Sequence, residues 1–156
     1  MTMTVHISCF QFHQNYYRAY KMGMDAHGID IRSYPFQNNK LKKLFDSGRI
    51  QIMSVLDHAP LTTDIVYCNG ILTYMDENTL PVVLGKFLGV KMLCAIHNTT
   101  EDIVAARKMG QELTTCNRPR LIKSNDWWIR TMNEHGFNAT YDPNLRCLIA
   151  IPQHIR

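Results

Sequence analysis

The sequence lacks CxxC cysteine pairs, long apolar runs and a strong excess of either charge. Its five cysteines form no CxxC pair, which argues against a structural zinc site. Four of them lie in or at the end of strand-like apolar runs, so they are expected to be buried, reduced thiols of a cytoplasmic protein. No stretch approaches eighteen apolar residues and the N-terminus has no apolar signal region, so no membrane span is predicted.

Glycine-rich phosphate-binding motifs are also absent. The chain has no GxGxxG and no P-loop, which excludes the usual dinucleotide-binding and NTPase classes. The net charge is only +4, and the one basic cluster, Lys40, Lys42 and Lys43, fits the polar face of a short helix. The sequence therefore has no strong nucleic-acid signal, and no metal or cofactor is predicted.

What the sequence does contain is a regular alternation of apolar strands and amphipathic helices, with 46% hydrophobic and 19% charged residues. The predicted strands are 5–10, 29–34, 50–56, 64–68, 90–96, 120–123 and 145–151. The predicted helices are 16–27, a short one around 41–45, 80–88, 100–113 and 126–135. This alternation predicts an α/β protein with a Rossmann-like, doubly wound parallel sheet in three α/β/α layers. With 156 residues and no internal linker, residues 1–156 are expected to form a single domain.

Ligands of such sheets bind where the strands end and the helices begin. The strongest candidate there is His97, as a catalytic residue directly after the strand VKMLCAI. The other candidates are predicted to bind substrate, and they are His13, Asn15, Arg18, Asn69, Asn98, Thr99, Ser124 and Trp127.

For most of these candidates, a purely structural role is also compatible with the sequence. Asn69, Thr99 and Ser124 are also good cap and turn residues, and Thr99 with Asp102 has capping-box spacing. The helix that carries Trp127 has core-like spacing, and Arg18 fits a solvated surface position as well as an anion site.

The order of these segments resembles the N-terminal, acceptor-side half of GT-B glycosyltransferases, in particular the retaining family 4-like enzymes. The stretches that carry the resemblance are NYYRAYKMGMDAHGIDI, DIVYCNGI, VKMLCAIHNTTEDI and the segment from RLIKSNDWW to CLIAIPQHI. The resemblance implies that His97 contacts the transferred sugar and that Ser124 is the serine after the next strand. It also implies a sugar acceptor and a nucleotide-sugar as partners.

The donor-binding half of such an enzyme is not in this sequence. The chain would then be a fragment, one part of a split enzyme or a reduced viral or mobile-element form. It would work with a second chain or as a homodimer. The final CLIAIPQHIR would lead into the missing domain.

Two other functions stay open from the sequence. His6 and His97 each begin an H-x-(S/T) motif, as in two-histidine phosphoesterases, where paired imidazoles serve as base and acid. The other hypothesis is a non-catalytic Rossmann-like interaction module, in which Phe12, Tyr16 and Tyr17 form a surface that binds another protein.

Overall fold

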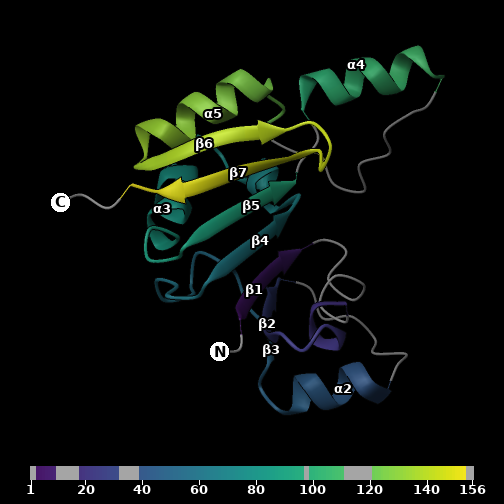
Figure 1. The fold of residues 1–156 in the computed structure, drawn as a ribbon, viewed down its shortest axis with the longest axis vertical. Helices are drawn as coiled ribbons and strands as arrows, with labels where there is room; N and C mark the ends of the chain where they lie inside the picture. The colour runs from purple at the N-terminus through teal and green to yellow at the C-terminus, as the bar shows by residue number, and fades with distance from the viewer. Residues whose placement is uncertain (1–2, 10–17, 32–38, 97–98, 111–120, 154–156) are drawn as a thin grey trace.

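The structure, a computed structural model, describes residues 3–9, 18–31, 39–96, 99–110 and 121–153. Its core is a seven-stranded sheet of order β3-β2-β1-β4-β5-β7-β6 (Figure 1). The strands are β1 Thr4–Cys9, β2 Asp25–Asp30, β3 Ile50–Ile52, β4 Ile65–Asn69, β5 Met92–Ile96, β6 Phe137–Asp142 and β7 Cys147–Pro152. The helices are α2 Asn39–Asp46, the 3-10 helix η1 Ile71–Tyr74, α3 Thr79–Lys86, α4 Thr100–Lys108 and α5 Asn125–Glu134. The predicted α/β, Rossmann-like fold is confirmed.

The sheet is parallel from β3 to β5 and then contains an antiparallel hairpin. Strand β7 runs antiparallel to both β5 and β6, whereas a parallel final strand was predicted. A short turn joins β6 to β7, and its Asp142 Oδ1 accepts hydrogen bonds from the backbone N–H of Asn144 at 2.8 Å and Leu145 at 3.1 Å. So short a connection can only join antiparallel neighbours.

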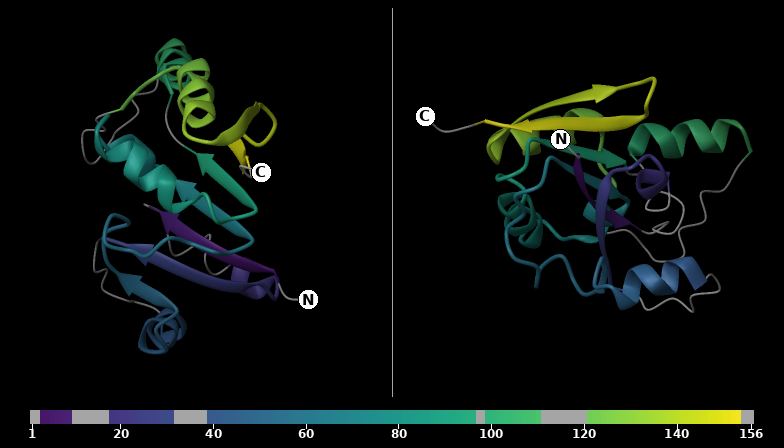
Figure 2. Two further views of the ribbon diagram at one scale, coloured as in Figure 1. Left: turned by 90° about the vertical axis from the view of Figure 1, so that its left-hand side faces the viewer. Right: turned by 60° about the horizontal axis from the view of Figure 1, so that its bottom comes forward.

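Helices pack on both sides of the sheet. On one face, α3 and α5 cover the main core, whose largest fully buried side chains include Trp128, Phe87 and Phe137 (Figure 2). On the other face, a smaller cluster joins Ala19, Ala26 and Ile50 to Leu44 of α2. Within the described ranges, no helix is long and apolar enough to cross a bilayer.

The second strand begins earlier than predicted, and the first helix ends earlier. Residues 18–21 are helical, and Gly23 then turns the chain with a φ of 76°. Residues 25–29 pair in parallel with β1, so the predicted helix over 16–27 is wrong at 25–27, and the strand predicted to begin at Ile29 begins at Asp25. Residues 32–34 of the predicted strand lie outside the described residues. Strand pairing outweighed the helical spacing that continues through Met24.

Two further strand predictions differ from the structure. Residues 121–124 form no strand, and the backbone N–H of Leu121 instead bonds to Thr73 O of η1 at 2.9 Å. Strand β6, in contrast, was not predicted. Its residues alternate between buried and exposed from Phe137 to Thr140, so a period-two signal was present in the sequence and was overlooked.

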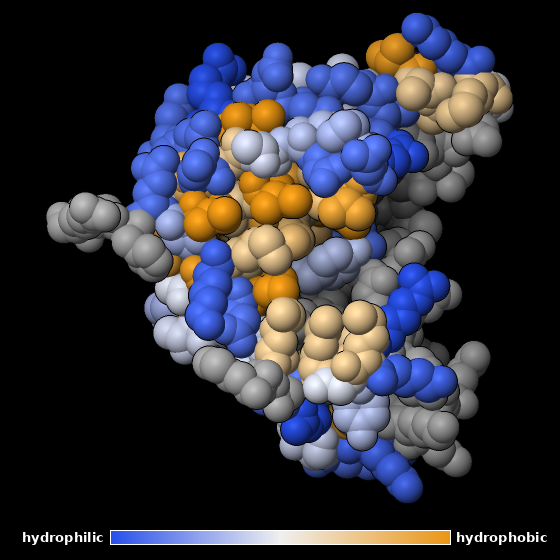
Figure 3. Space-filling model, viewed as in Figure 1, coloured by the Kyte–Doolittle hydropathy of each residue, from blue (hydrophilic) through white to orange (hydrophobic). Residues whose placement is uncertain are grey.

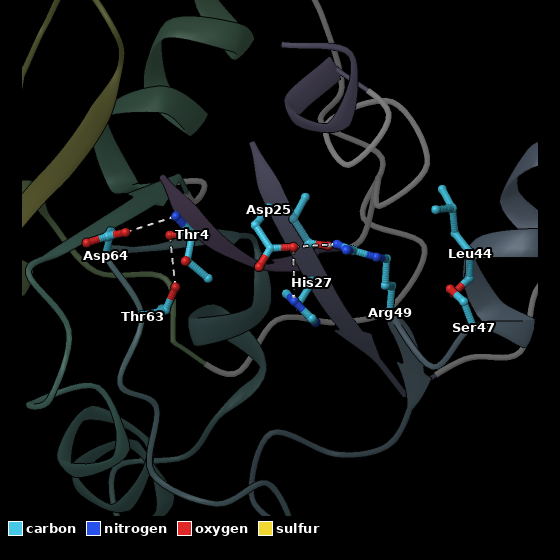
Figure 4. Close-up of polar contacts among 9 residues, drawn as sticks. Thr4, Asp25, His27, Leu44, Ser47, Arg49, Thr63 and Asp64 are labelled. Carbon is cyan, nitrogen blue, oxygen red and sulfur yellow. Dashed lines mark hydrogen bonds and ion pairs between the residues drawn. The ribbon is translucent and has the colours of Figure 1, made fainter. Parts of the chain in front are cut away.

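Polar side chains hold the strands together at their amino ends (Figure 4). Asp64 accepts a hydrogen bond from the backbone N–H of Thr4 at 2.9 Å, and the Thr63 hydroxyl donates to the Thr4 carbonyl at 2.9 Å. On the other side, Arg49 Nη1 lies 2.5 Å from Asp25 Oδ1. The hydrogen bond to Arg49 is the main cause that lowers the pKa of Asp25. These contacts lie at the edge opposite to the one where ligands of such sheets bind.

Candidate functional site

The strand order defines one favoured place for a ligand. From β1 the chain builds outward to β2 and β3 on one side, and then to β4 and β5 on the other. Such a reversal leaves a crevice outside the carboxyl ends of the two central strands. We therefore take the carboxyl ends of β2, β1 and β4 as the candidate site and call it the switch edge.

Asp30 is the acidic residue of the switch edge. It is the last residue of β2 and is only 8% exposed. Among the residues whose burial the structure describes, it is the only acidic or basic side chain in the buried class. Its carbonyl accepts a hydrogen bond from the Met53 N–H at 2.9 Å, which fixes the backbone at the strand end. Burial of a carboxylate is costly unless donors meet it, and we take Asp30 as a candidate ligand contact because it lies at this edge of the sheet.

Asn69 and Gly70 lie at the other side of the switch edge. Asn69 ends β4 and is half-buried, and its Cα is in register with Cys9 of β1. Gly70 has a φ of 77°, and a Cβ built on it would meet no atom within 4 Å. Its backbone is held by a 2.6 Å hydrogen bond from its N–H to Ile96 O and a 2.7 Å bond from the Thr73 hydroxyl to its carbonyl. The result is a rigid backbone with open space beside it.

Asp30 and Asn69 flank the end of β1 from opposite sides. Their strands are both neighbours of β1, so their backbones are roughly 10 Å apart, two strand spacings. Strand alternation puts both residues on the same face of the sheet. A flat ligand about as long as a nucleoside could therefore contact both.

The turn after β3 brings two further polar residues, Ser54 and Asp57, to the switch edge. The Ser54 hydroxyl accepts a hydrogen bond from Leu56 N at 3.2 Å, and Ser54 O accepts from Asp57 N at 3.1 Å. Val55 is buried in the core and anchors the turn, while the Asp57 side chain is exposed. Within the described residues, no group of three or more His, Cys, Asp and Glu could hold a metal ion.

The structure brings Thr99 and Ser124 into neighbouring loops, where both act as helix caps. The Thr99 hydroxyl accepts from Asp102 N at 3.2 Å, and Asp102 accepts from Thr99 N at 3.0 Å, so the predicted capping box of α4 is confirmed. Ser124 accepts from Trp127 N at 3.2 Å and caps α5. A bond from Thr100 N to Lys123 O, 3.1 Å long, joins the two loops.

The remaining predicted site residues are spread over the chain. Trp127 packs edge-to-face on Trp128 with ring centroids 5.0 Å apart, and Lys123 Nζ lies 5.2 Å from its ring. Arg18 is exposed on the helical residues 18–21, and Asn69 lies at the switch edge. Four predicted residues lie outside the described ranges, namely His13, Asn15, His97 and Asn98.

Sequence reasoning missed Asp30, Gly70 and the turn at 54–57. The signal for Asp30 was present, because an acidic residue ends the second strand about twenty residues after the first, as in nucleotide-binding α/β folds. The strand had been placed at 29–34, which put Asp30 near its beginning and hid the signal.

No protein-family model and no curated protein sequence matches the chain. Solved structures do match it in fold. The 1,6-didemethyltoxoflavin-N1-methyltransferase of Burkholderia thailandensis, with bound S-adenosylhomocysteine, has a TM-score of 0.67 and 9% identity over 97% of this chain and 72% of its own. Magnesium protoporphyrin IX methyltransferase from Synechocystis PCC 6803, also with bound S-adenosylhomocysteine, has a TM-score of 0.66 and 12% identity, covering 97% and 74%.

The pyocyanin biosynthetic protein PhzM is similar as well, with a TM-score of 0.64 and 13% identity over 97% of this chain. The chain spans only 51% of the length of PhzM. Identities this low establish a shared fold and nothing finer.

These comparisons correct the glycosyltransferase interpretation. The fold neighbours whose names state an activity are methyltransferases and not GT-B glycosyltransferases, so the predicted function, the sugar acceptor and the nucleotide-sugar are wrong. The motifs behind the resemblance were general features of βα alternation. The segment CLIAIP forms β7 inside an antiparallel hairpin, whereas the sequence predicted a parallel sheet throughout.

Proposed function

We propose that this chain binds S-adenosylmethionine at the switch edge and takes part in methyl transfer. The fold shared with methyltransferases supports the proposal. The observation that carries it is the buried Asp30 carboxylate at the carboxyl end of β2. We also propose a cytoplasmic location, which the free thiols of Cys68, Cys94 and Cys147 support.

Asp30 fits the ribose of an adenosyl group. A carboxylate in this position accepts hydrogen bonds from ribose hydroxyls in α/β nucleotide-binding folds. The two hydroxyls of a ribose diol match the two oxygens of one carboxylate. Low exposure of Asp30 excludes competing water and strengthens these bonds.

We expect other residues of the switch edge to contact the parts of S-adenosylmethionine other than its ribose. The open backbone beside Gly70 leaves room where a side chain would block a ligand, and Asn69 offers both a donor and an acceptor. The exposed carboxylate of Asp57 is an acceptor for the amino group of a base. The chain departs from the usual pattern after β1, where Phe12, His13, Gln14 and Asn15 replace a glycine-rich turn.

The bound cofactor would supply an electrophilic methyl group on its sulfonium sulfur. The chain's task would be to hold the cofactor, exclude water and orient the acceptor. His97 and Asn98, which follow β5 in the sequence, remain our candidates for contacts with the acceptor, and a histidine there could take up the proton that the acceptor loses. His13, Asn15 and Arg18 remain candidates for cofactor or substrate contacts.

Calorimetric titration with S-adenosylhomocysteine tests the proposal. We expect the wild-type chain to bind and Asp30→Asn to bind about 10- to 100-fold more weakly, because hydrogen bonds to a charged acceptor are worth about 1.5–3 kcal/mol. Asp46→Asn is the matched control, since Asp46 is an exposed carboxylate paired with Lys42 on α2. Absence of wild-type binding, or equal binding by Asp30→Asn, would contradict the proposal.

A further inference from the structure

Asn69 and Gly70 form the only Asn-Gly pair in the sequence, and they lie at the switch edge. In an Asn-Gly pair the backbone nitrogen of the glycine can attack the side-chain carbonyl carbon of the asparagine, because glycine has no side chain to hinder the attack. The new C–N bond closes a succinimide ring, and the side-chain nitrogen leaves as ammonia with the proton of the glycine N–H. Water then opens the ring to aspartate or isoaspartate.

The backbone conformation explains why a glycine follows Asn69. Gly70 has a φ of 77° and a ψ of −14°, in the left-handed region that residues with a side chain rarely adopt. The turn therefore calls for glycine, while the asparagine before it is a candidate ligand contact. Together these two requirements place the reactive pair at the switch edge.

The folded structure holds the Gly70 peptide away from this reaction. Its N–H donates a 2.6 Å hydrogen bond to Ile96 O, and its carbonyl accepts a 2.7 Å bond from the Thr73 hydroxyl. Thr73 is itself only 4% exposed, and its carbonyl accepts a 2.9 Å bond from Leu121 N. Because the Gly70 nitrogen must lose its proton and turn toward the Asn69 side chain, the bond to Ile96 has to break before the attack.

Asn69 is fixed on the strand side of the pair as well. It is the last residue of β4, and its Cα lies in register with Cys9 of β1 and Ile96 of β5. Ring closure needs the Gly70 nitrogen nearly eclipsed with the Asn69 Cβ, whereas extended strand backbone turns this nitrogen well away from Cβ. Apolar side chains gather over β5 and β7 (Figure 3), and hydrogen bonds in apolar surroundings are costly to break.

We propose that Asn69 is a latent deamidation site, which the pairing of β4 with β5 blocks in the folded chain and which local opening of the switch edge exposes. Deamidation would replace an amide, which donates and accepts hydrogen bonds, by a carboxylate, which only accepts them. The isoaspartate product would also insert a methylene group into the backbone before Gly70. Either product would weaken ligand binding at the switch edge; this consequence rests on the proposed function, whereas the reaction itself does not.

Mass spectrometry of peptides from the full chain, incubated in mildly alkaline buffer, measures the deamidation rate at each asparagine. In urea, Asn69 should react several-fold faster than Asn78 and Asn144, which are followed by threonine and leucine and are exposed in the folded chain. In the folded chain Asn69 should react about tenfold more slowly than in urea, or slower still, because each hydrogen bond that must break lowers the reactive population by up to about tenfold. Equal rates at Asn69 in the folded and unfolded chain would overturn the proposal.

Thr73→Val removes the hydroxyl that holds the Gly70 carbonyl and keeps the shape of the side chain. It should speed deamidation of Asn69 in the folded chain by about 2- to 10-fold, the factor for loss of one hydrogen bond. Thr131→Val, at a buried threonine of α5, is the matched control and should leave the rate unchanged. Urea unfolding of both variants gives their global stability. An unchanged rate in Thr73→Val, or a gain no larger than its loss of global stability explains, would overturn the proposal.

Calorimetry tests the consequence for the site. Asn69→Asp, which has the charge of the deamidated chain, should bind S-adenosylhomocysteine about 2- to 10-fold more weakly than the wild type, because one donor is lost. Equal binding by the two would overturn the effect on the site. Lack of binding by the wild type would instead contradict the proposed function, and the deamidation rates are measured without ligand, so the two failures are distinguishable.

Discussion

Gly89, just after α3, packs against the backbone of another segment, and its replacement tests how rigid that contact is. A Cβ at Gly89 would lie 2.6 Å from the carbonyl oxygen of Leu61, closer than any relaxed contact. The backbone of Leu61 is fixed against a shift away from Gly89, because its N–H donates to Lys86 O at 2.8 Å and its side chain is buried in the core. Gly89→Ala therefore forces one of two fixed backbones to move.

The expected cost is that of overpacking a well-ordered interior, about 1–3 kcal/mol. For a chain of this size, 1 kcal/mol corresponds to about 2–4 °C in Tm, so Tm should fall by about 2–12 °C. Gly85→Ala provides a control of opposite sign. Gly85 lies within α3, no atom stands within 4 Å of its added Cβ, and alanine in a helix is worth about 0.5–1 kcal/mol over glycine.

Urea unfolding and thermal melting of the two variants give the comparison directly. Neither glycine has a left-handed φ, so backbone strain does not enter and the contact alone distinguishes them. We expect Gly89→Ala to be destabilised and Gly85→Ala to be stabilised. If Gly89→Ala were as stable as the wild type, the fixed approach of Leu61 to the end of α3 would be refuted.

Two more predictions concern ionisable groups. Burial raises the pKa of Asp102, but hydrogen bonds from Thr99 N–H and Arg146 lower it more, so the net shift is downward. The carboxylate therefore stabilises the fold at pH values above the ordinary value of 3.8, and this contribution is lost as pH falls through the lower folded pKa. Asp102→Asn should cost about 1 kcal/mol in urea unfolding at pH 7, and the cost should shrink below about pH 4; a constant cost would contradict the argument. Burial, with a smaller effect of Cys147, raises the pKa of the Cys94 thiol to about 11. Iodoacetamide should thus alkylate native Cys94 much more slowly at pH 8 than in urea, and equal rates would contradict its shielding.

The sequence predicted the elements whose signals are local. Thr99 and Asp102 predicted the capping box of α4, and Ser124 was recognised as a possible cap of α5; both are confirmed. The apolar runs of β4 and β5 also lie where they were predicted. These features depend on contacts between residues a few positions apart, which sequence spacing alone determines.

The sequence did not reveal how the last strands pair. The run at 147–152 is apolar on both faces, and such a run is compatible with either direction of pairing. Its direction depends on β6, whose alternation of buried and exposed residues was overlooked, and on the tight turn at Asp142. The glycosyltransferase interpretation was overturned separately, by the fold neighbours, which include methyltransferases.

The candidate site was only partly accessible from the sequence. The rule that ligands bind at strand ends pointed to Asn69, which lies at the switch edge; its role in binding stays a prediction. Asp30 was missed because the first helix was extended through Gly23, which displaced β2 by several residues. A displacement of this kind changes which residue ends a strand, and so changes the residue that a ligand would meet.

The sequence by itself thus determined the class of the fold, its alternation of strands and helices, and the helix caps, since all of these follow from local spacing. Only the tertiary structure decided that β7 runs antiparallel between β5 and β6. Only the tertiary structure placed Asp30 and Asn69 on either side of β1. The physical reason is that strand order and direction are set by hydrogen bonds between segments far apart in the chain. No spacing within one segment encodes them.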